Sequence, residues 1–406
     1  MVNLVESGVC APKGFRAAGV HCGIRRNKTK SDLAMIVSDV PCAAAGVYTT
    51  NKVKGAPLAV TKAHLADGYA QAVICNSGNA NTCAPNGVWL AETTCELTAE
   101  ALGLKPEDII VSSTGVIGEE LTIDPFKRGI PELVKKLAYN GSDAAAYAIM
   151  TTDTIKKEVA VFFEIGGKMC RMGAIAKGSG MINPNMATML CFITTDCAIT
   201  PALLQKALSE SVKDTFNQIS VDGDTSTNDS VFILANGMAE NEMIADENSE
   251  EFKIFCEALN MVGARMARYI ASDGEGATKL LECTVKGAPD HEVARVVSKT
   301  VIQSSLLKAA MFGEDANWGR VLCAVGYAKA DFDISKIEVQ LASGFGSVTV
   351  CKDAKYHDYS EDMAAEILTA KEIQIIVDLH QGEGTAKAWG CDLTYDYVKI
   401  NGDYRT

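Results

Sequence analysis

The sequence predicts a layered α/β (α+β) fold, a sandwich in which sheets are covered by helices. Short β-branched runs that end at polar or glycine residues alternate with longer segments of helical periodicity along the whole chain. At 406 residues the chain is longer than the roughly 250–300 residues that one hydrophobic core usually covers. Apolar residues make up 48% and charged residues 22% of the chain, as in ordinary globular proteins. We therefore expect one large layered body or two substructures.

The first half of the chain contains the clearest strand patterns. Strands are expected over 33–40, 71–76 and 108–114, where β-branched residues precede polar ones. The segment 158–176 is expected to form a hairpin, because Gly166-Gly167 divides two apolar runs. A helix is expected over 88–104, where apolar residues recur with helical spacing.

The second half begins with helical patterns and ends with strands. Thr200 and Pro201 are expected to open a helix over 200–216, as N-cap and first-turn residue. A second helix is expected over 251–270, and the stripe of Val293, Val297 and Val301 predicts a third. Strands are expected at 337–343, 347–351 and 372–379. Two Gly-Glu-Gly segments, at 274–276 and 382–384, are interpreted as unrelated turns rather than a repeat.

Charge and hydropathy exclude several classes of protein. The net charge of −13 argues against a nucleic-acid partner, and the densest basic run, Gly23–Lys30, is interpreted as a solvated loop. The most apolar window, 33–48, is interrupted by Asp39, short of the roughly 20 residues that a membrane span requires. Glu6 stands near the N-terminus with no apolar segment beside it, so we expect no secretory signal and a cytoplasmic protein.

Cysteine and histidine spacing does not indicate a metal site. The chain contains fourteen cysteines without a C-x-x-C pair, and they are interpreted mainly as small buried hydrophobic residues. The five histidines lie far apart in sequence and form no H-E-x-x-H motif. No glycine-rich segment matches a phosphate-binding loop, and no G-x-S-x-G elbow is present. We therefore expect neither a metal nor a nucleotide cofactor.

Thr188 stands at an abrupt boundary between a turn-rich segment and an apolar run. Residues 178–185 include two glycines, two asparagines and a proline, whereas 189–193 are apolar and extended in pattern. If the Ala187–Thr188 bond were cut, the new α-amino group, with a pKa of about 7.7–8.0, could serve as the base that activates the Thr188 hydroxyl. Taken alone, however, an Ala-Thr pair at this boundary favours an ordinary strand start.

An acyl-transferring threonine also requires hydrogen-bond donors for the developing oxyanion. The segment Val111–Gly118 is expected to be a strand that exits at Thr114 and Gly115, where a hydroxyl and a backbone N–H could converge. A simple strand-to-loop exit is the alternative interpretation of these two residues.

A series of motifs resembles the arginine-biosynthesis ornithine acetyltransferase family, whose members are also called glutamate N-acetyltransferases. The motifs follow one another in family order along nearly the whole chain. They are "CNSGNAN" (Cys75–Asn81), "SSTGVIG" (Ser112–Gly118), "TTDT" (Thr151–Thr154), "KGSGMINPNMATML" (Lys177–Leu190), "SDGEGATK" (Ser272–Lys279), "FGEDANWGR" (Phe312–Arg320) and "INGDYRT" (Ile400–Thr406).

The resemblance implies a self-processing enzyme. The precursor would cut itself between Ala187 and Thr188 into an α chain, residues 1–187, and a β chain, residues 188–406. Thr188 would then take the acetyl group from N2-acetyl-L-ornithine, release ornithine and pass the acetyl group to L-glutamate. The resemblance further implies a layered α/β sandwich and an α2β2 heterotetramer. Whether acetyl-CoA also serves as a donor stays open.

The family's functional positions map onto eight residues of this chain. Thr114 and Gly115 match the positions that stabilise the oxyanion. The matches to substrate-binding positions are Thr151, Lys177, Thr188, Glu275, Asn401 and Thr406. A lysine such as Lys177 can pair with a substrate carboxylate, and Glu275 is a plausible partner for the ornithine ammonium group.

Two other functions are alternative interpretations of this sequence. An N-terminal-threonine amidase or aminopeptidase would use the same nucleophile with water, rather than glutamate, as acyl acceptor. A non-catalytic α/β binding protein would leave the chain uncut.

Overall fold

The computed structural model describes residues 2–5, 7–183 and 189–403. They form two compact units. Unit 1 comprises Met1–Gly178, Pro184–Lys213 and Thr225–Met266, and unit 2 comprises Ser179–Asn183, Asp214–Asp224 and Ala267–Thr406. Each unit has its own sheet. The predicted α/β layering is confirmed.

The sheet of unit 1 has nine strands within the described residues, and most follow the order β1-β6-β7-β8-β10-β3-β4-β5, with β2 paired to β3. The strand bounds are β1 Asn3–Val5, β2 Phe15–Val20, β3 Leu33–Tyr48, β4 Tyr69–Asn79, β5 Ile109–Val116, β6 Lys157–Ile165, β7 Lys168–Lys177, β8 Leu190–Thr195 and β10 Ser230–Ala235. The hairpin β6–β7 turns at Gly166 and Gly167, both at positive φ, as predicted.

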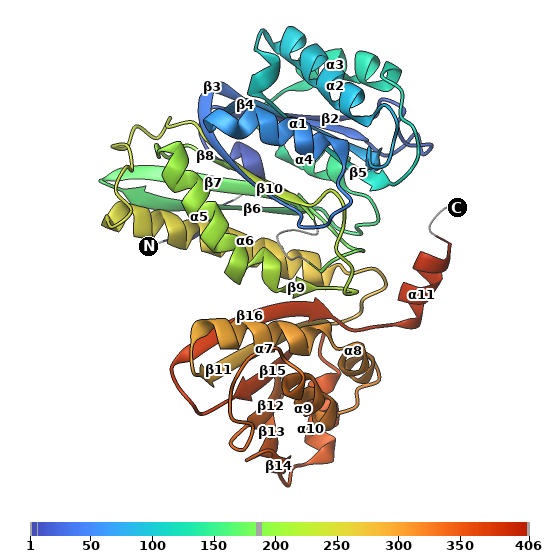
Figure 1. Cartoon of the computed structure of the whole chain (residues 1–406), viewed down its shortest axis with the longest axis vertical. Helices are drawn as coiled ribbons and strands as arrows, with labels where there is room; N and C mark the ends of the chain where they lie inside the picture. Colours follow the sequence, from blue (N-terminus) through green and yellow to red (C-terminus); the bar gives the residue numbers. More distant parts are fainter. Residues whose placement is uncertain (1, 6, 184–188, 404–406) are drawn as a thin grey trace. The chain divides into compact units, whose positions relative to one another are not determined.

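Strand β3 joins two layers of this sheet. Its first part pairs with β2 and β4, its second part pairs with β10, and the register with β4 shifts between Val37 and Cys42. Ile36 and Cys75 from one arm share a buried cluster with Phe192 and Phe232 from the other. The sheet therefore folds over on itself and encloses a core between its two layers (Figure 1).

Helices cover both outer faces of unit 1 (Figure 1). Leu90 of α2 and Phe126 of α3 lie in a buried cluster with residues of β2–β5. On the other face, Phe255 of α6 meets Phe163 of β6 edge-on, and the side chain of Gln205 in α5 bonds Gly46 of β3. The bounds of the covering helices are α1 Ala56–His64, α2 Gly87–Leu102, α3 Asp124–Lys136, α5 Pro201–Asp214 and α6 Glu250–Ser272. Helix α4, Ser142–Ile149, instead contributes Ala145 and Ile149 to the buried cluster between the two layers.

Unit 2 is built on a sheet of seven strands within its described residues, in the order β14-β13-β12-β15-β11-β16-β9. The strands are β9 Ile219–Ser220, β11 Leu280–Ala288, β12 Glu338–Ser343, β13 Gly346–Lys352, β14 Lys355–Tyr356, β15 Glu372–Asp378 and β16 Gly384–Cys391. The helices are α7 His291–Gln303, α8 Ser305–Phe312, α9 Trp318–Gly326, α10 Glu361–Leu368 and α11 Tyr395–Gly402. Asp290 caps α7 by accepting a hydrogen bond from the Val293 N–H.

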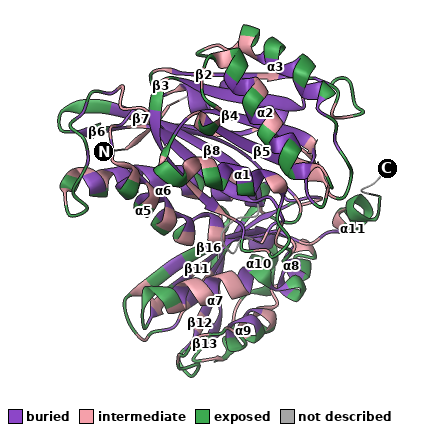
Figure 2. Ribbon diagram, turned by 45° about the horizontal axis from the view of Figure 1, so that its top comes forward, coloured by how far each residue is buried: buried purple, intermediate pink, exposed green. Residues whose placement is uncertain are grey.

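Burial follows the predicted patterns in both units (Figure 2). Val297 and Val301 of the predicted α7 stripe are fully buried, and Val293 packs against the same core. Eleven of the fourteen cysteines are buried free thiols, as predicted; Cys83 and Cys323 are exposed and Cys256 is half-buried. In the described residues, no helix combines the length and hydropathy that a membrane crossing requires.

One sequence-based interpretation is wrong in part. Residues 26–30 of the basic run are exposed, as a solvated loop should be, but Arg25 is half-buried and its Nε and Nη2 atoms lie out of contact with solvent. Periodicity could not identify this arginine, because its stem lies against a glycine far along the chain, Gly78.

Candidate functional site

The candidate residues divide between the two units. Thr114, Gly115, Thr151 and Lys177 lie in unit 1, and Glu275 and Asn401 lie in unit 2. Ala187, Thr188 and Thr406 lie outside the described residues.

Thr114 and Gly115 lie near the end of β5, next to the end of β4. In the parallel register Thr114 pairs with Ser77 and Gly115 with Gly78. Gly115 has φ +134°, and a Cβ at this position would lie 2.3 Å from the Gly78 carbonyl carbon. Only glycine therefore fits here. The predicted strand exit is confirmed, although β5 continues to Val116.

A short segment of unit 1, residues 228–230, links the end of β5 to the start of β8. The Asn228 amide Nδ2 donates to the carbonyl oxygens of Ser113, at 2.9 Å, and Ala80, at 2.5 Å. Two residues later, the Ser230 N–H donates to the Met189 carbonyl oxygen at 2.9 Å. Ser113 directly precedes Thr114, and Met189 directly follows Thr188. The chain neighbours of the proposed nucleophile and of the proposed oxyanion donor are thus held by one segment.

The fold of β3 explains why these residues lie at the same edge. Asn76 of β4 pairs with Leu33 at the first end of β3, and Ser230 of β10 pairs with Tyr48 at its last end. Because β3 bends back on itself, its two ends lie at the same edge of the sandwich, away from the bend. The two pairings therefore lie at that edge. This edge collects loop residues from both layers.

Lys177, the last residue of β7, lies beside a buried ion pair. It is opposite Leu190 in the β7–β8 ladder and is 7% exposed. The fully buried Lys157 donates from Nζ to Asp153 Oδ1 at 2.6 Å. Burial opposes ionisation of the Asp153 carboxyl, but the Lys177 and Lys157 ammonium groups lower its pKa below the ordinary value. Lys157 thus bonds the Asp153 carboxylate directly, and the Lys177 ammonium group adds positive charge near it.

The same carboxylate also accepts hydrogen bonds from two backbone N–H groups, one before and one after Lys157 in the sequence. Asp153 Oδ1 accepts from the Gly178 N–H at 2.7 Å, and Asp153 Oδ2 accepts from the Thr151 N–H at 2.9 Å. Thr151 and Lys177, predicted separately, are therefore brought together by Asp153.

Arg25 adds a further positive charge to this region. A Cβ on Gly78 would lie 2.7 Å from Arg25 Cγ, so the arginine stem crosses the strand that pairs with Gly115. Burial raises the pKa of the Cys75 thiol to about 12, while the positive charges of Lys177 and Arg25 oppose that rise.

In unit 2, Glu275 and Asn401 are in direct contact. The Asn401 amide Nδ2 donates to Glu275 Oε2 at 2.8 Å, so α11 and the turn after α6 are joined at this point. Glu275 is 7% exposed, and its N–H donates to the Ser179 carbonyl oxygen at 3.0 Å. A Cβ on Gly180 would lie 2.3 Å from the Glu275 carboxyl carbon, so only glycine allows this approach.

Sequence reasoning missed Asp153, Lys157, Arg25 and Asn228. Asp153 lies within the quoted Thr151–Thr154 motif, so its signal was a carboxylate beside a predicted binding residue. Lys157 follows it by four residues and opens a strand, where a lysine normally faces solvent. Asn228 had no local signal, because its partners lie more than a hundred residues away.

The fold and these residues together define an α/β protein whose candidate site residues are polar or charged. A family model described as the ArgJ family matches residues 16–406. The chain belongs to the ArgJ family. The resemblance stated from the motifs is confirmed, and the protein is an acetyltransferase of arginine biosynthesis.

Similarity to curated relatives extends over the whole chain. The arginine biosynthesis bifunctional protein ArgJ of Caldanaerobacter subterraneus subsp. tengcongensis is 48% identical over 406 residues, which covers 100% of both chains. The protein of the same name from Symbiobacterium thermophilum is 51% identical over 404 residues and 99% of each chain. A crystal structure of the Bacillus halodurans protein has 46% identity and a TM-score of 0.51, covering 53% of this chain and 100% of that chain.

Proposed function

We propose that the enzyme carries the acetyl group of N2-acetyl-L-ornithine to L-glutamate as an ester on Thr188, after cutting its own Ala187–Thr188 bond. In the cut, Thr188 Oγ attacks the Ala187 carbonyl carbon, and the Thr188 nitrogen leaves as a free amine. Water then hydrolyses the ester between Ala187 and Thr188 Oγ. The products are residues 1–187, ending in a carboxylate, and residues 188–406, beginning with the Thr188 amine.

The strand order indicates that the two fragments would stay together. Strands β7 and β8 lie on opposite sides of the proposed cut, yet they pair along Met172–Lys177 and Leu190–Thr195. β10 pairs with β8 on one edge and with β3 on the other, so strands of both fragments alternate in one sheet. The whole B. halodurans chain in the matched crystal structure covers 53% of this chain, about the share of one fragment, which also supports a two-chain enzyme.

Transfer would proceed in two balanced half-reactions. The Thr188 amine takes the hydroxyl proton as Oγ attacks the acetyl carbonyl of N2-acetylornithine. The C–N bond breaks, ornithine leaves with a proton on its amine, and the acetyl group remains on Oγ. The glutamate amine then attacks this ester, forms a C–N bond and returns the hydroxyl. The Thr114 hydroxyl and the Gly115 N–H would stabilise the oxyanion in both steps.

The charged candidate residues suit different ends of the substrates. Lys177, beside Thr151 and the shared Asp153 carboxylate, would bind a substrate carboxylate. Glu275, with Asn401, would bind the side-chain ammonium group of ornithine. Thr188 and Thr406 complete the proposed substrate-binding set. The ester on Thr188 retains the acetyl group between the half-reactions, so this cycle uses neither a metal nor a bound cofactor.

The observation that carries the proposal is the shared anchoring by residues 228–230. Asn228 fixes Ser113, directly before the proposed oxyanion donor, and Ser230 fixes Met189, directly after the proposed nucleophile. A nucleophile and an oxyanion site must lie within a few ångströms of one reacting carbonyl.

The test is to incubate the enzyme with N2-acetylornithine and glutamate and to quantify the products. Acetylglutamate formed in equal amount to ornithine is expected; free acetate in place of acetylglutamate would instead support the amidase rival. A denaturing gel addresses the binding-protein rival, because an uncut and correctly folded chain of 43.1 kDa contradicts self-processing. N-terminal sequencing of the smaller bands should begin at Thr188 for the β chain.

The relatives' name favours a second activity. Curated relatives are called bifunctional, and we propose acetyl-CoA as an additional acetyl donor for glutamate. Acetylglutamate formation from acetyl-CoA and glutamate, without acetylornithine, measures this activity directly. We also propose a cytoplasmic α2β2 heterotetramer of the two fragments, which the mass of the native particle in solution tests.

A further inference from the structure

Asp222 holds the backbone that leads to the proposed cut. Its Oδ2 accepts from the Met181 N–H at 2.6 Å, and its Oδ1 accepts from the Ile182 N–H at 2.8 Å. A backbone hydrogen bond also joins the two segments with donor and acceptor exchanged, because the Val221 N–H donates to the Ile182 carbonyl oxygen at 2.6 Å. Consecutive backbone donors on one carboxylate fix both the position and the orientation of this peptide. All of these residues belong to unit 2.

The fixed segment extends to Asn183. The Asn183 amide Nδ2 donates to the Gly223 carbonyl oxygen at 3.0 Å, and Gln303 Nε2 donates to Asn183 Oδ1 at 2.6 Å. Within the segment, Met181 has φ +56°, a left-handed conformation that non-glycine residues seldom adopt. Such a conformation persists only where surrounding contacts enforce it, and it is concentrated at functional sites.

The C-terminal helix contributes to the same cluster. Burial and the charges of the Asp222 and Glu275 carboxylates raise the pKa of the hydroxyl of Tyr397, a residue of α11, above its ordinary value. Asp222 thus accepts hydrogen bonds from the segment before the cut and also influences a side chain of the helix that carries Asn401.

We propose that Asp222 is a positioning residue for self-cleavage, a role that rests on the proposed function. By fixing Met181 and Ile182, it restricts the backbone that must present the Ala187 carbonyl to Thr188 Oγ. Bonds that are already fixed lose no entropy when the attacking geometry forms, which accelerates an intramolecular attack. Gln303 supports the same segment one residue further along, through Asn183.

The test follows the cut during cell-free synthesis of the full chain, with translation stopped and the uncut band measured over time. Asp222→Asn loses the charge and one acceptor, and its cleavage is expected to slow at least about tenfold. Asp222→Glu should recover part of the rate, and Gln303→Leu should slow the cut about fivefold. Asp224→Asn is the matched control, since it removes an exposed carboxylate two residues away; its rate should stay within about twofold of wild type.

Two further measurements separate positioning from general damage. In the uncut Thr188→Ala background, Asp222→Asn and Asp224→Asn should have similar melting temperatures. Once cleavage of Asp222→Asn is complete, its loss in the transfer kcat should be much smaller than its loss in the cleavage rate. Cleavage of Asp222→Asn at the wild-type rate, or equal slowing of Asp222→Asn and Asp224→Asn, overturns the positioning role. If the wild-type chain itself stays uncut, the proposed function fails instead.

Discussion

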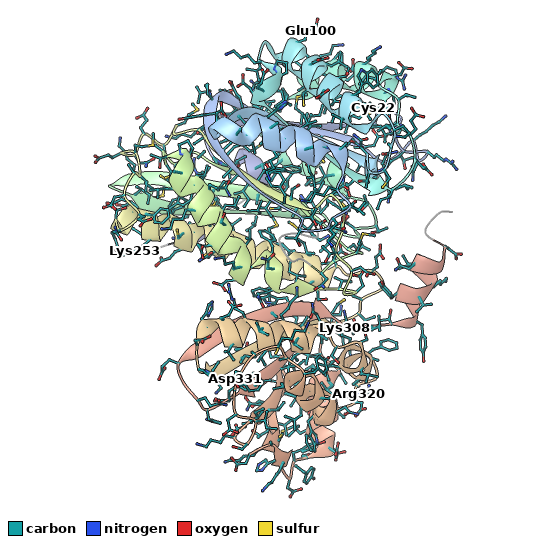
Figure 3. The ribbon with its side chains drawn as sticks, in the orientation of Figure 1. Cys22, Glu100, Lys253, Lys308, Arg320 and Asp331 are labelled. Carbon is teal, nitrogen blue, oxygen red and sulfur yellow. The ribbon has the colours of Figure 1, made fainter. Side chains whose placement is uncertain are left out.

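The two units bury lysine side chains in different ways. In unit 1, Lys157 is fully buried against Asp153, and Lys177 lies beside the same carboxylate. In unit 2, the buried Lys279 donates to the carbonyl oxygens of Met311, at 3.2 Å, and Leu368, at 2.6 Å, as well as to Glu314. Lys308, labelled in Figure 3, donates to the Val221 carbonyl oxygen.

The difference distinguishes structural lysines from a candidate binding lysine. Carbonyl oxygens bind the ammonium groups of Lys279 and Lys308, together with the Glu314 carboxylate for Lys279, and these bonds link neighbouring segments of unit 2. In unit 1, Lys157 is bonded to the Asp153 carboxylate and Lys177 is a second positive charge near it, which makes Lys177 the candidate for binding an anion such as a substrate carboxylate. Glu275 in unit 2 is bonded by the neutral Asn401 amide, which leaves its negative charge available for a cation.

Asp153→Asn should have the largest effect on stability. It removes the carboxylate from a fully buried ion pair and leaves the Lys157 ammonium group uncompensated, which costs about 3–5 kcal/mol. Urea denaturation measures the loss. The matched control is Asp143→Asn, which breaks the more exposed pair with Lys156 and should cost less than about 1 kcal/mol. Equal losses in the two variants would contradict a special role for the buried pair.

The stabilising effect of Asp153 should also depend on pH with a defined sign. Because its pKa is lowered in the folded state, its contribution is present above the unfolded-state value of about 3.9 and is lost as the pH falls below it. The difference in free energy of unfolding between wild type and Asp153→Asn should be constant at neutral pH and should narrow under more acidic conditions. If the difference in free energy of unfolding widens as the pH falls, the pKa of Asp153 is not lowered in the folded state.

Lys177→Met should mainly impair substrate binding. Losing a charge-assisted bond to a carboxylate lowers kcat/KM for acetylornithine by about 30- to 150-fold, or 2–3 kcal/mol. Initial-rate kinetics measure the change. Lys168→Met, at the exposed opposite end of β7, provides the control and should leave kcat/KM near the wild-type value. A loss no greater than that of the control would remove Lys177 from the proposed site.

Glu275→Gln should have a smaller and more selective effect. Losing the negative charge should raise KM for acetylornithine about tenfold, while KM for glutamate changes less, because glutamate has no side-chain ammonium group. The second Gly-Glu-Gly turn supplies the control: Glu383 is exposed whereas Glu275 is buried. Comparable increases for both substrates would refute the assignment of Glu275 to the ornithine ammonium group.

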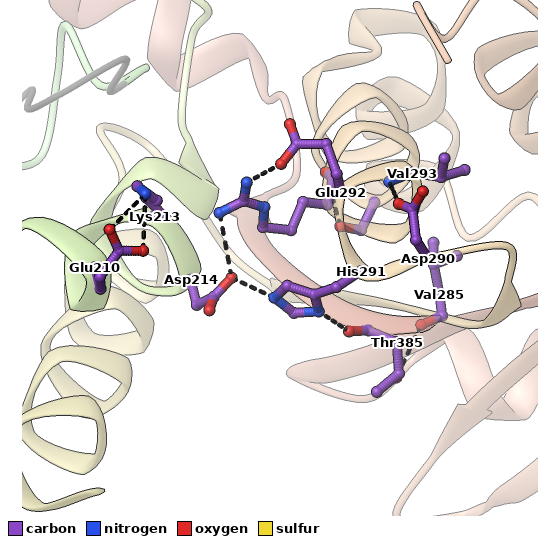
Figure 4. A network of polar contacts seen from close by, with 11 residues as sticks. Glu210, Lys213, Asp214, Val285, Asp290, His291, Glu292, Val293 and Thr385 are labelled. Atoms are coloured by element: carbon purple, nitrogen blue, oxygen red, sulfur yellow. Dashed lines mark hydrogen bonds and ion pairs between the residues drawn. The ribbon is translucent and has the colours of Figure 1, made fainter. Parts of the chain in front are cut away.

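His291→Ala should have the smallest effect. The ring of this α7 residue bridges the Thr385 carbonyl oxygen, at 2.6 Å, and Asp214 Oδ1, at 2.7 Å (Figure 4). Since the His291 side chain is 53% exposed, we expect a loss of about 0.5–1 kcal/mol in the free energy of unfolding. His357→Ala, also at an exposed position, is the control, and transfer activity should be the same in both.

Local patterns predicted the elements, whereas long-range pairing had to come from the structure. The hairpin at Gly166-Gly167 and the helix opened by Pro201 follow from turn and cap chemistry. The apolar window 33–48, which Asp39 makes too short for a membrane span, is the single bent strand β3. Its bend joins two layers through partners at 70–76 and 230–235, which periodicity within the window does not reveal.

The candidate site likewise contains some residues that local motifs identify and others that only long-range contacts identify. Thr114 and Lys177 were identifiable because each lies in a short motif beside a strand end. Asp153, which joins Thr151 to Lys177, is a carboxylate whose importance depends on complete burial between two lysines. The basic run that contains Arg25 predicts a solvated loop, and the local pattern does not reveal that the arginine stem lies close to Gly78.

The most direct test of the central claim is to trap the acetyl group on the enzyme. The cut enzyme is incubated with N2-acetylornithine in the absence of glutamate, and the mass of the 188–406 fragment is measured. A gain of one acetyl group on Thr188, lost on addition of glutamate with stoichiometric formation of acetylglutamate, is the expected result. Turnover of acetylornithine with glutamate while the fragment remains unmodified, or acetyl carried on another residue, would contradict the account.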